Sequence, residues 1–254
     1  MDDDGFIKVE RFKYKTLNNK KKNRKNNKYK FNDSDEWNID DITLVLNQRK
    51  ETLLNSRFYK DLLVIFDKYL IPINPYDIVC YGIGSMQKSK NAQYQFVLAL
   101  LLRDILKIPG KIFIYDPVMT ELDKELCQLH NLEIIKENEF GKRSVTRATL
   151  FYMPHCGKGL YSNTLSANWN AEQLPNVSII GNRFDMYVGS QLEKELIKEC
   201  PYLIPAIDIV NCILFPKEFD NNQIFNDLSI QTFPKENVSR LDSQFWLNVP
   251  TQLE

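Results

Sequence analysis

Short runs of continuous apolar residues alternate with helical patterns through most of the chain. Because each run is short and bounded by turn residues, five of them predict strands, at 78–81, 111–115, 132–136, 148–153 and 177–180. Between the first two, residues 91–107 predict a helix, which we expect to be deeply buried because residues 96–102 are apolar on all sides. Strands that are apolar throughout are typical of a parallel sheet with helices on both faces. The pattern therefore predicts an α/β fold, a three-layer Rossmann-like parallel sheet.

The remaining helices are predicted by apolar residues at helical spacing. Such residues recur over 42–54 and over 58–70, and Pro72 ends the second pattern. Thr120 can cap a further helix in which Leu122, Leu126 and Leu129 share one stripe. A last helix is expected near residues 189–199. The two helices before the first strand are expected to pack on the core of the sheet.

Charge divides the chain into two parts, although its formal net charge is zero. Residues 8–30 hold eleven Lys or Arg against one acid, with few apolar residues between them. We therefore predict a disordered basic arm over residues 1–35 and one α/β domain over residues 36–254. The arm has two interpretations. It is a solvated tail, or residues 20–25 serve as a nuclear import signal or a nucleic-acid contact.

Composition narrows the class of protein further. No run of 18 apolar residues is present, which argues against a membrane span, and the acidic start Met1–Gly5 does not resemble a secretory signal. Five cysteines are scattered without a C-x-x-C pair, so neither a disulfide framework nor a zinc site is expected. Cys80 and Cys212 lie in apolar runs and are expected to be buried. These features favour a cytoplasmic protein, with entry to the nucleus as a further expectation.

The carboxyl ends of the predicted strands offer a place for a ligand. In a doubly wound sheet of order 3-2-1-4-5, strands one and four are neighbours at the switch point, where ligands bind. Gly82 and Gly84 would let a backbone loop approach a ligand closely, with Ser85 following them. The third glycine of a dinucleotide fingerprint is replaced by Gln87. Asp116 ends strand two, where it could accept a ribose hydroxyl or simply form a turn with Pro117.

The loop after strand four carries one of the two histidines next to a cysteine. Because adjacent side chains in an extended chain point to opposite sides, His155 and Cys156 are not expected to form a catalytic dyad. The loop also offers too few ligands for a metal site. We assign no catalytic residue and no metal ligand. The candidate cofactor-binding residues are Gly82, Gly84, Ser85, Asp116, His155, Cys156 and Asn182.

Several segments in this order resemble the SRR-like ("sensitivity to red light reduced") family over roughly residues 40–235. They are Cys80–Ser85, Tyr94-Gln95, Tyr115–Pro117, Glu137–Glu139 with Gly141–Arg143, Phe151–Gly157, Ile179–Asn182 and Phe225–Asp227. The family's last motif often continues to a His and an aromatic residue before Phe-Pro. Gln231-Thr232 stand there in this chain, so any role of that histidine does not carry over.

The resemblance implies a regulator in a circadian clock input pathway that acts on clock-gene expression. An animal branch of the family is tied to regulation of haem biosynthesis, and a fungal branch to microtubule-related processes. Two alternatives stay open. One is an enzyme or sensor that binds a nucleotide-like small molecule at the strand edge. The other is a regulator of haem biosynthesis that contacts haem through His155 and Cys156. The resemblance names no cofactor and no protein partner.

Overall fold

The computed structural model describes residues 37–190, 192–220 and 223–249. The predicted basic arm lies outside these residues, and so do the last five residues of the predicted domain. No helix in the described part of the chain is both long and apolar enough to cross a membrane.

One seven-stranded sheet, in the order β3-β2-β1-β4-β5-β7-β6, forms the middle layer. Its strands are β1 (Asp77–Tyr81), β2 (Ile112–Tyr115), β3 (Glu133–Ile134), β4 (Thr149–Met153), β5 (Val177–Asn182), β6 (Asn211–Leu214) and β7 (Leu228–Thr232). Strands β1 to β5 pair in parallel, whereas β7 runs antiparallel to both β5 and β6. The predicted order 3-2-1-4-5 and the Rossmann-like α/β class are confirmed.

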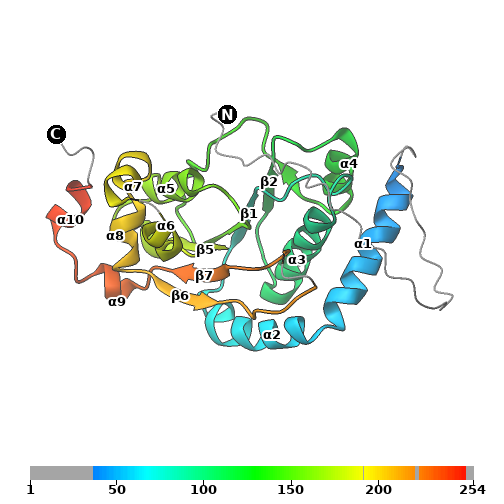
Figure 1. The fold of residues 1–254 in the computed structure, drawn as a ribbon, viewed down its shortest axis with the longest axis horizontal. Coiled ribbons are helices and arrows are strands. Elements are labelled where there is room, and N and C mark those ends of the chain that lie inside the picture. Colours follow the sequence, from blue (N-terminus) through cyan, green and yellow to red (C-terminus); the bar gives the residue numbers. More distant parts are fainter. Residues whose placement is uncertain (1–36, 191, 221–222, 250–254) are drawn as a thin grey trace.

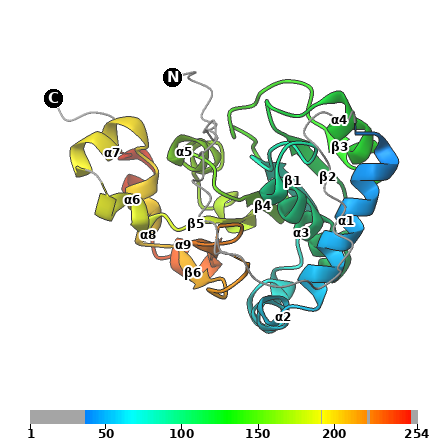
Figure 2. The same cartoon turned by 45° about the vertical axis from the view of Figure 1, so that its right-hand side comes forward.

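Helices cover both faces of this sheet. One layer contains α1 (Ile39–Leu54), α2 (Arg57–Tyr69), α3 (Lys90–Leu106) and α4 (Glu121–Leu129), and the other contains α5 (Lys158–Ser166), α6 (Asp185–Ser190), α7 (Glu193–Glu199) and α8 (Leu203–Ile207). The short η1 (Ile71–Ile73) follows α2, η2 (Leu174–Asn176) precedes β5, and α9 (Lys235–Val238) and α10 (Ser243–Leu247) follow β7. Figures 1 and 2 show the two groups of helices on opposite sides of the sheet.

Successive side chains of the central strands point to opposite faces of the sheet, so the core has two halves, one under each layer of helices. Ile78 and Cys80 of β1 belong to the cluster under α1 to α4, whereas Val79 and Tyr81 belong to the cluster under α5, α7 and α8. Neighbouring side chains of a strand point to opposite faces, so a strand buried on both faces has to be apolar throughout. The predicted packing of the N-terminal helices on the core is confirmed, with Ile42 and Leu62 fully buried.

Local signals explain where the helices begin. Asn38 accepts the backbone N–H groups of Asp40 and Asp41 at the start of α1, and the Asp41 carboxylate accepts from the Asn38 N–H. Thr120 caps α4 in the same reciprocal manner with Asp123, whereas at the start of α3 the Ser89 hydroxyl accepts the Ala92 N–H. Such caps satisfy backbone donors that have no partner within the helix. The expected cap at Thr120 is confirmed.

Three expectations need correction. The single helix expected near residues 189–199 is two helices, α6 and α7. The strand expected at 132–136 is reduced to the two residues of β3. Cys212 is exposed rather than buried, because β6 is the last strand of the sheet and has a neighbour on one side only. Cys80 is buried as expected.

Candidate functional site

The registers bring the carboxyl ends of β1, β4 and β5 to one level of the sheet. Cys80 lies opposite Tyr152, and Tyr152 lies opposite Ile180. The loops that begin at Gly82, Pro154 and Arg183 therefore leave the sheet side by side. The adjacency of strands one and four is as predicted, whereas ligand binding at this edge remains a prediction.

Asp116 joins the loop after β1 to the loop after β2. Its Oδ2 atom accepts the Gly84 N–H at 2.7 Å, and its Oδ1 atom accepts the Val118 N–H at 2.9 Å. Gly82 and Gly84 have φ angles of 71° and 82°, a region that side chains disfavour. The structure thus brings Gly84 and Asp116 together. The Asp116 carboxylate already binds two backbone donors, which fits its interpretation as a turn residue.

Cys156 packs into the sheet edge instead of facing solvent. Its thiol donates to the Tyr81 carbonyl at 3.3 Å, and burial, followed by the charge of Asp116, raises the pKa of this thiol well above its usual range. A Cβ atom at Gly82 would lie 2.5 Å from the Cys156 Sγ atom. Glycine is needed at position 82 because the cysteine side chain occupies this space.

His155 points to a different neighbour. Its Nε2 atom lies 3.0 Å from the carbonyl oxygen of Ile224, in the segment before β7. Burial lowers the pKa of the imidazole, so the neutral form is favoured. The backbone of His155 has a φ of 56°. The two neighbouring side chains therefore reach separate partners, although the left-handed backbone of His155 is not the extended conformation assumed in the sequence argument.

Asn182 has one satisfied side-chain group and one unsatisfied one. Its Nδ2 group donates to the Tyr187 hydroxyl at 3.1 Å, which itself donates to the Cys156 carbonyl at 3.4 Å. Its Oδ1 atom is buried without a hydrogen-bond partner among the described residues, and the same holds for the Ser85 hydroxyl. Buried polar atoms without partners are rare in folded proteins and call for an explanation.

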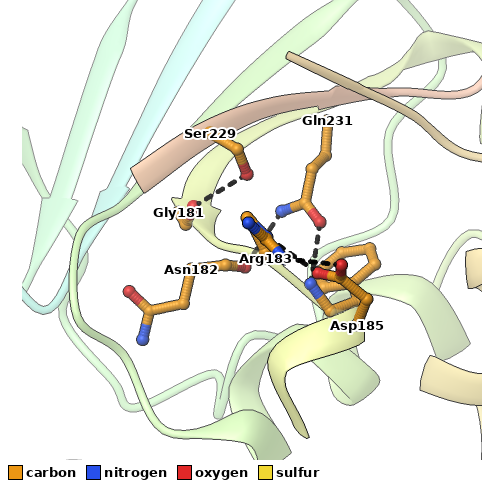
Figure 3. Close-up of polar contacts among 7 residues, drawn as sticks. Gly181, Asn182, Arg183, Asp185, Ser229 and Gln231 are labelled. Carbon is orange, nitrogen blue, oxygen red and sulfur yellow. Dashed lines mark hydrogen bonds and ion pairs between the residues drawn. The ribbon is translucent and has the colours of Figure 1, made fainter. Parts of the chain in front are cut away.

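Gln231 of β7 was not among the predicted site residues, and it fixes the end of β5 at Asn182 and the turn that follows it (Figure 3). Its Nε2 group donates to the Asn182 carbonyl at 3.1 Å, and its Oε1 atom accepts the Phe184 N–H at 3.1 Å. Ser229 of the same strand donates to the Gly181 carbonyl. Gln231 is fully buried. A signal for this role was present in the sequence: Leu228–Thr232 alternates apolar and polar residues, and an amide buried in such a strand needs hydrogen-bond partners.

A second group of residues missing from the prediction lies at the ends of β1 and β3. The Tyr81 hydroxyl donates to Glu139, and Arg143 forms two hydrogen bonds with the Glu139 carboxylate, at 2.9 and 2.7 Å. Burial raises the pKa of Glu139, but the hydrogen bonds from Arg143 and Tyr81 outweigh burial and hold this pKa below its usual range. The Arg143 guanidinium also lies 4.4 Å from the centre of the Phe113 ring. This cluster therefore links the carboxyl end of β1 to the Phe113 ring of β2.

Two surface hollows lie away from this edge. One is between α1 and α4, where Asp40 and Glu125 face it, and the other is beside η2. Neither contains a predicted site residue. In the part of the chain that the structure describes, no group of three His, Cys, Asp or Glu side chains is placed to hold a metal ion.

The burial of the cysteines predicts their order of alkylation. Burial also raises the pKa of the Cys212 thiol, but we expect iodoacetamide to label Cys212 first in the native protein, since it is the exposed cysteine among the described residues. Cys156 and Cys127 should react only after unfolding, because the thiolate is the nucleophile and burial raises the pKa of Cys127 to about 12 and that of Cys156 further still. Mass spectrometry of peptides from native and urea-unfolded protein measures this. Rapid native labelling of Cys156 would show that its loop opens.

Comparison with known proteins gives consistent matches. The family model of the SRR1 domain matches residues 65–232. An SRR1-like protein of Drosophila melanogaster is 33% identical over 172 residues, which cover 66% of this chain and 59% of the relative. An SRR1-like protein of Mus musculus is 36% identical over 132 residues, covering 51% and 53% respectively. Protein SENSITIVITY TO RED LIGHT REDUCED 1 of Arabidopsis thaliana is 34% identical over 111 residues, covering 43% and 40%.

The matched stretches thus span about half the length of these relatives. A solved structure, the SAH-bound Podospora anserina methyltransferase PaMTH1, shares 12% identity with a TM-score of 0.41, over 74% of this chain and 87% of that one. A likeness of this extent carries no argument about ligand or activity. The family match covers the whole sheet from β1 to the last residue of β7, so the chain belongs to the SRR1 domain family.

Proposed function

We propose that this protein is a regulator in a circadian clock input pathway and acts on clock-gene expression. Membership of the SRR1 family is the observation that carries the proposal, together with an Arabidopsis relative named for reduced sensitivity to red light. The match includes all seven strands, so the sheet and its carboxyl edge are the shared part. Location in the cytoplasm and the nucleus belongs to the same proposal.

Deletion of the protein in its own cell tests this function. We expect the period or phase of clock-gene transcripts to change under constant conditions, and re-expression of the full chain to restore the rhythm. Transcript levels sampled through several cycles provide the measurement. An unchanged rhythm in the deletion strain would contradict the proposal.

A second candidate function is that of a small-molecule sensor that uses the edge of β1, β4 and β5. The specific observation in its favour is that Ser85 Oγ and Asn182 Oδ1 are buried without a hydrogen-bond partner among the described residues, as are the Tyr152 hydroxyl of β4 and Trp169 Nε1. A ligand would supply the hydrogen bonds that these atoms lack. Native mass spectrometry of protein purified from its own cell tests this function, with a co-purifying mass as the expected result.

The contacts of His155 and Cys156 argue against direct haem binding. Haem iron would have to displace the Tyr81 carbonyl from the Cys156 thiol and the Ile224 carbonyl from His155 Nε2. The raised pKa of the Cys156 thiol also opposes formation of the thiolate that binds iron. Within the proposal, the small molecule therefore ranks above haem as the ligand of this edge.

A further inference from the structure

We infer that the hollow between α1 and α4 binds the basic arm of the same chain, through lysine and arginine side chains within residues 20–30. The inference goes beyond the proposed function, because the contact forms inside one chain whatever its pathway. Residues 20–25, the candidate nuclear import signal or nucleic-acid contact, lie within this stretch. A docked arm therefore competes with either of those uses.

The hollow combines acidic and apolar groups. It lies between the start of α1 and the end of α4, and its lining consists of Ile39, Asp40, Thr43, Glu125, Gln128 and Leu129. Asp40 and Glu125 have no ion-pair partner among the described residues, whereas Glu121 of α4 pairs with Lys124 at 2.7 Å. Leu129 is 58% exposed. Two carboxylates beside an apolar surface suit lysine and arginine, because the stems of these side chains cover apolar groups while the charged ends stay at the surface.

The end of α4 adds to the attraction for a cation. The last turn of a helix carries a partial negative charge, which favours basic side chains nearby. No basic residue lies in the last turn of α4, and none lines the hollow. Arg103 reaches only the cap of this helix, where it donates to the His130 carbonyl at 2.7 Å. The part of the helix end that faces the hollow therefore has room for a further cation.

The arm supplies the complementary charge, and it joins the domain at the rim of the hollow. Residues 20–30 hold seven Lys or Arg and no acid, whereas residues 37–254 hold 26 Asp or Glu against 22 Lys or Arg. Trp37, the first described residue, is two positions before Ile39 in the lining. Only residues 31–36 separate the basic stretch from Trp37. A tether this short gives the arm an effective concentration on the order of millimolar at the hollow.

The other hollow, beside η2, lacks these features. It contains a single acid, Glu172, and no apolar side chain larger than that of Ala171. It is also far from the arm in sequence. Glu172 is exposed, and no ion pair involves it within the described part of the chain. This residue is therefore the reference carboxylate against which docking of the arm can be measured.

Carbodiimide cross-linking of the full chain, read by mass spectrometry, tests the contact. The reagent joins a lysine amine to a carboxylate only where the two groups touch. We expect lysines of residues 20–30 to be joined to Glu125 and Asp40 with a yield at least about fivefold above that on Glu172, because the tether holds them at the hollow. In about 1 M salt, where the Debye length is about 3 Å, the yield should fall to the level of Glu172.

Glu125→Gln and Glu172→Gln are the matched variants, since each removes one exposed carboxylate from a hollow. Glu125→Gln should lower the yield on Asp40 about two- to fivefold, the effect of one exposed ion pair. Glu172→Gln should leave the yield on Asp40 unchanged. Circular dichroism melts confirm that both variants fold.

Two results would overturn the inference. Yields on Glu125 and Asp40 no higher than on Glu172 would show that the arm does not dock in this hollow. In a mixture of unlabelled and nitrogen-15-labelled protein, cross-links that join a labelled to an unlabelled chain would assign the hollow to the arm of a second copy. Cross-links confined to chains of one label are the expected result.

Discussion

Gly181→Ala is expected to lower the free energy of unfolding by about 2–3 kcal/mol, as overpacking of a rigid core does. Gly181 is buried in β5, and a Cβ atom there would lie 2.6 Å from Cε1 and 2.8 Å from the hydroxyl oxygen of Tyr161. Tyr161 cannot move away cheaply, because it is fully buried and its hydroxyl donates to the Met153 carbonyl and accepts from the Asn182 N–H. Urea unfolding followed by circular dichroism measures the loss.

Gly159→Ala serves as the control for this substitution. Gly159 lies in α5, and a Cβ atom there meets nothing within 4 Å. Alanine should therefore leave stability unchanged or raise it by up to about 1 kcal/mol, because glycine is a poor helix former. Equal stability of the two variants would show that Tyr161 adjusts freely to the added methyl group.

Gln231→Leu is expected to cost about 3 kcal/mol and to loosen the end of β5 at Asn182. The change removes two hydrogen bonds and leaves the buried Phe184 N–H and the Asn182 carbonyl without their present partner. An unsatisfied buried polar group costs about 1–3 kcal/mol. Urea unfolding followed by circular dichroism measures this loss.

Gln48→Leu makes the same chemical change at an exposed position of α1. Its effect on stability should stay within about 0.5 kcal/mol, as for most surface substitutions. If both glutamine variants lost similar stability, the hydrogen bonds of Gln231 would not be the cause of its effect.

The order of the first five strands could be predicted because each of them is an apolar run followed by a helix or a long loop. The last two strands could not. In β7 the apolar run is interrupted by Ser229 and Gln231, whose partners are the carbonyl groups of Gly181 and Asn182, nearly fifty residues earlier. A local pattern holds no information about such distant partners. In β6 the four residues form an edge, and an apolar run alone does not say where a sheet ends, which is why Cys212 was expected to be buried.

For the candidate site, the sequence predicted which loops meet but not how their side chains are used. Gly84 and Asp116 are in contact, but the contact is a hydrogen bond in which the Asp116 carboxylate accepts the Gly84 N–H. The same carboxylate also accepts the Val118 N–H. Helix α5 was also missed, because its sequence is rich in polar residues. Two of these, Ser162 and Thr164, are buried. The Thr164 hydroxyl lies within hydrogen-bond distance of the Gly141 and Leu160 carbonyl groups. Periodicity recognises apolar faces, so it overlooks a helix that buries its own hydroxyl groups.

The antiparallel strand β7 has a consequence for how the chain is made on the ribosome. This strand lies between β5 and β6 in the sheet, but it is synthesised after both. Until residue 232 has emerged, β5 keeps an open edge, with the backbone of Ile179 and Ile180 unpaired on that side. An open apolar edge is a template for pairing with other chains. A nascent chain or a truncation that ends before β7 is therefore expected to require a chaperone or to aggregate, even though every other strand of the sheet has already been made.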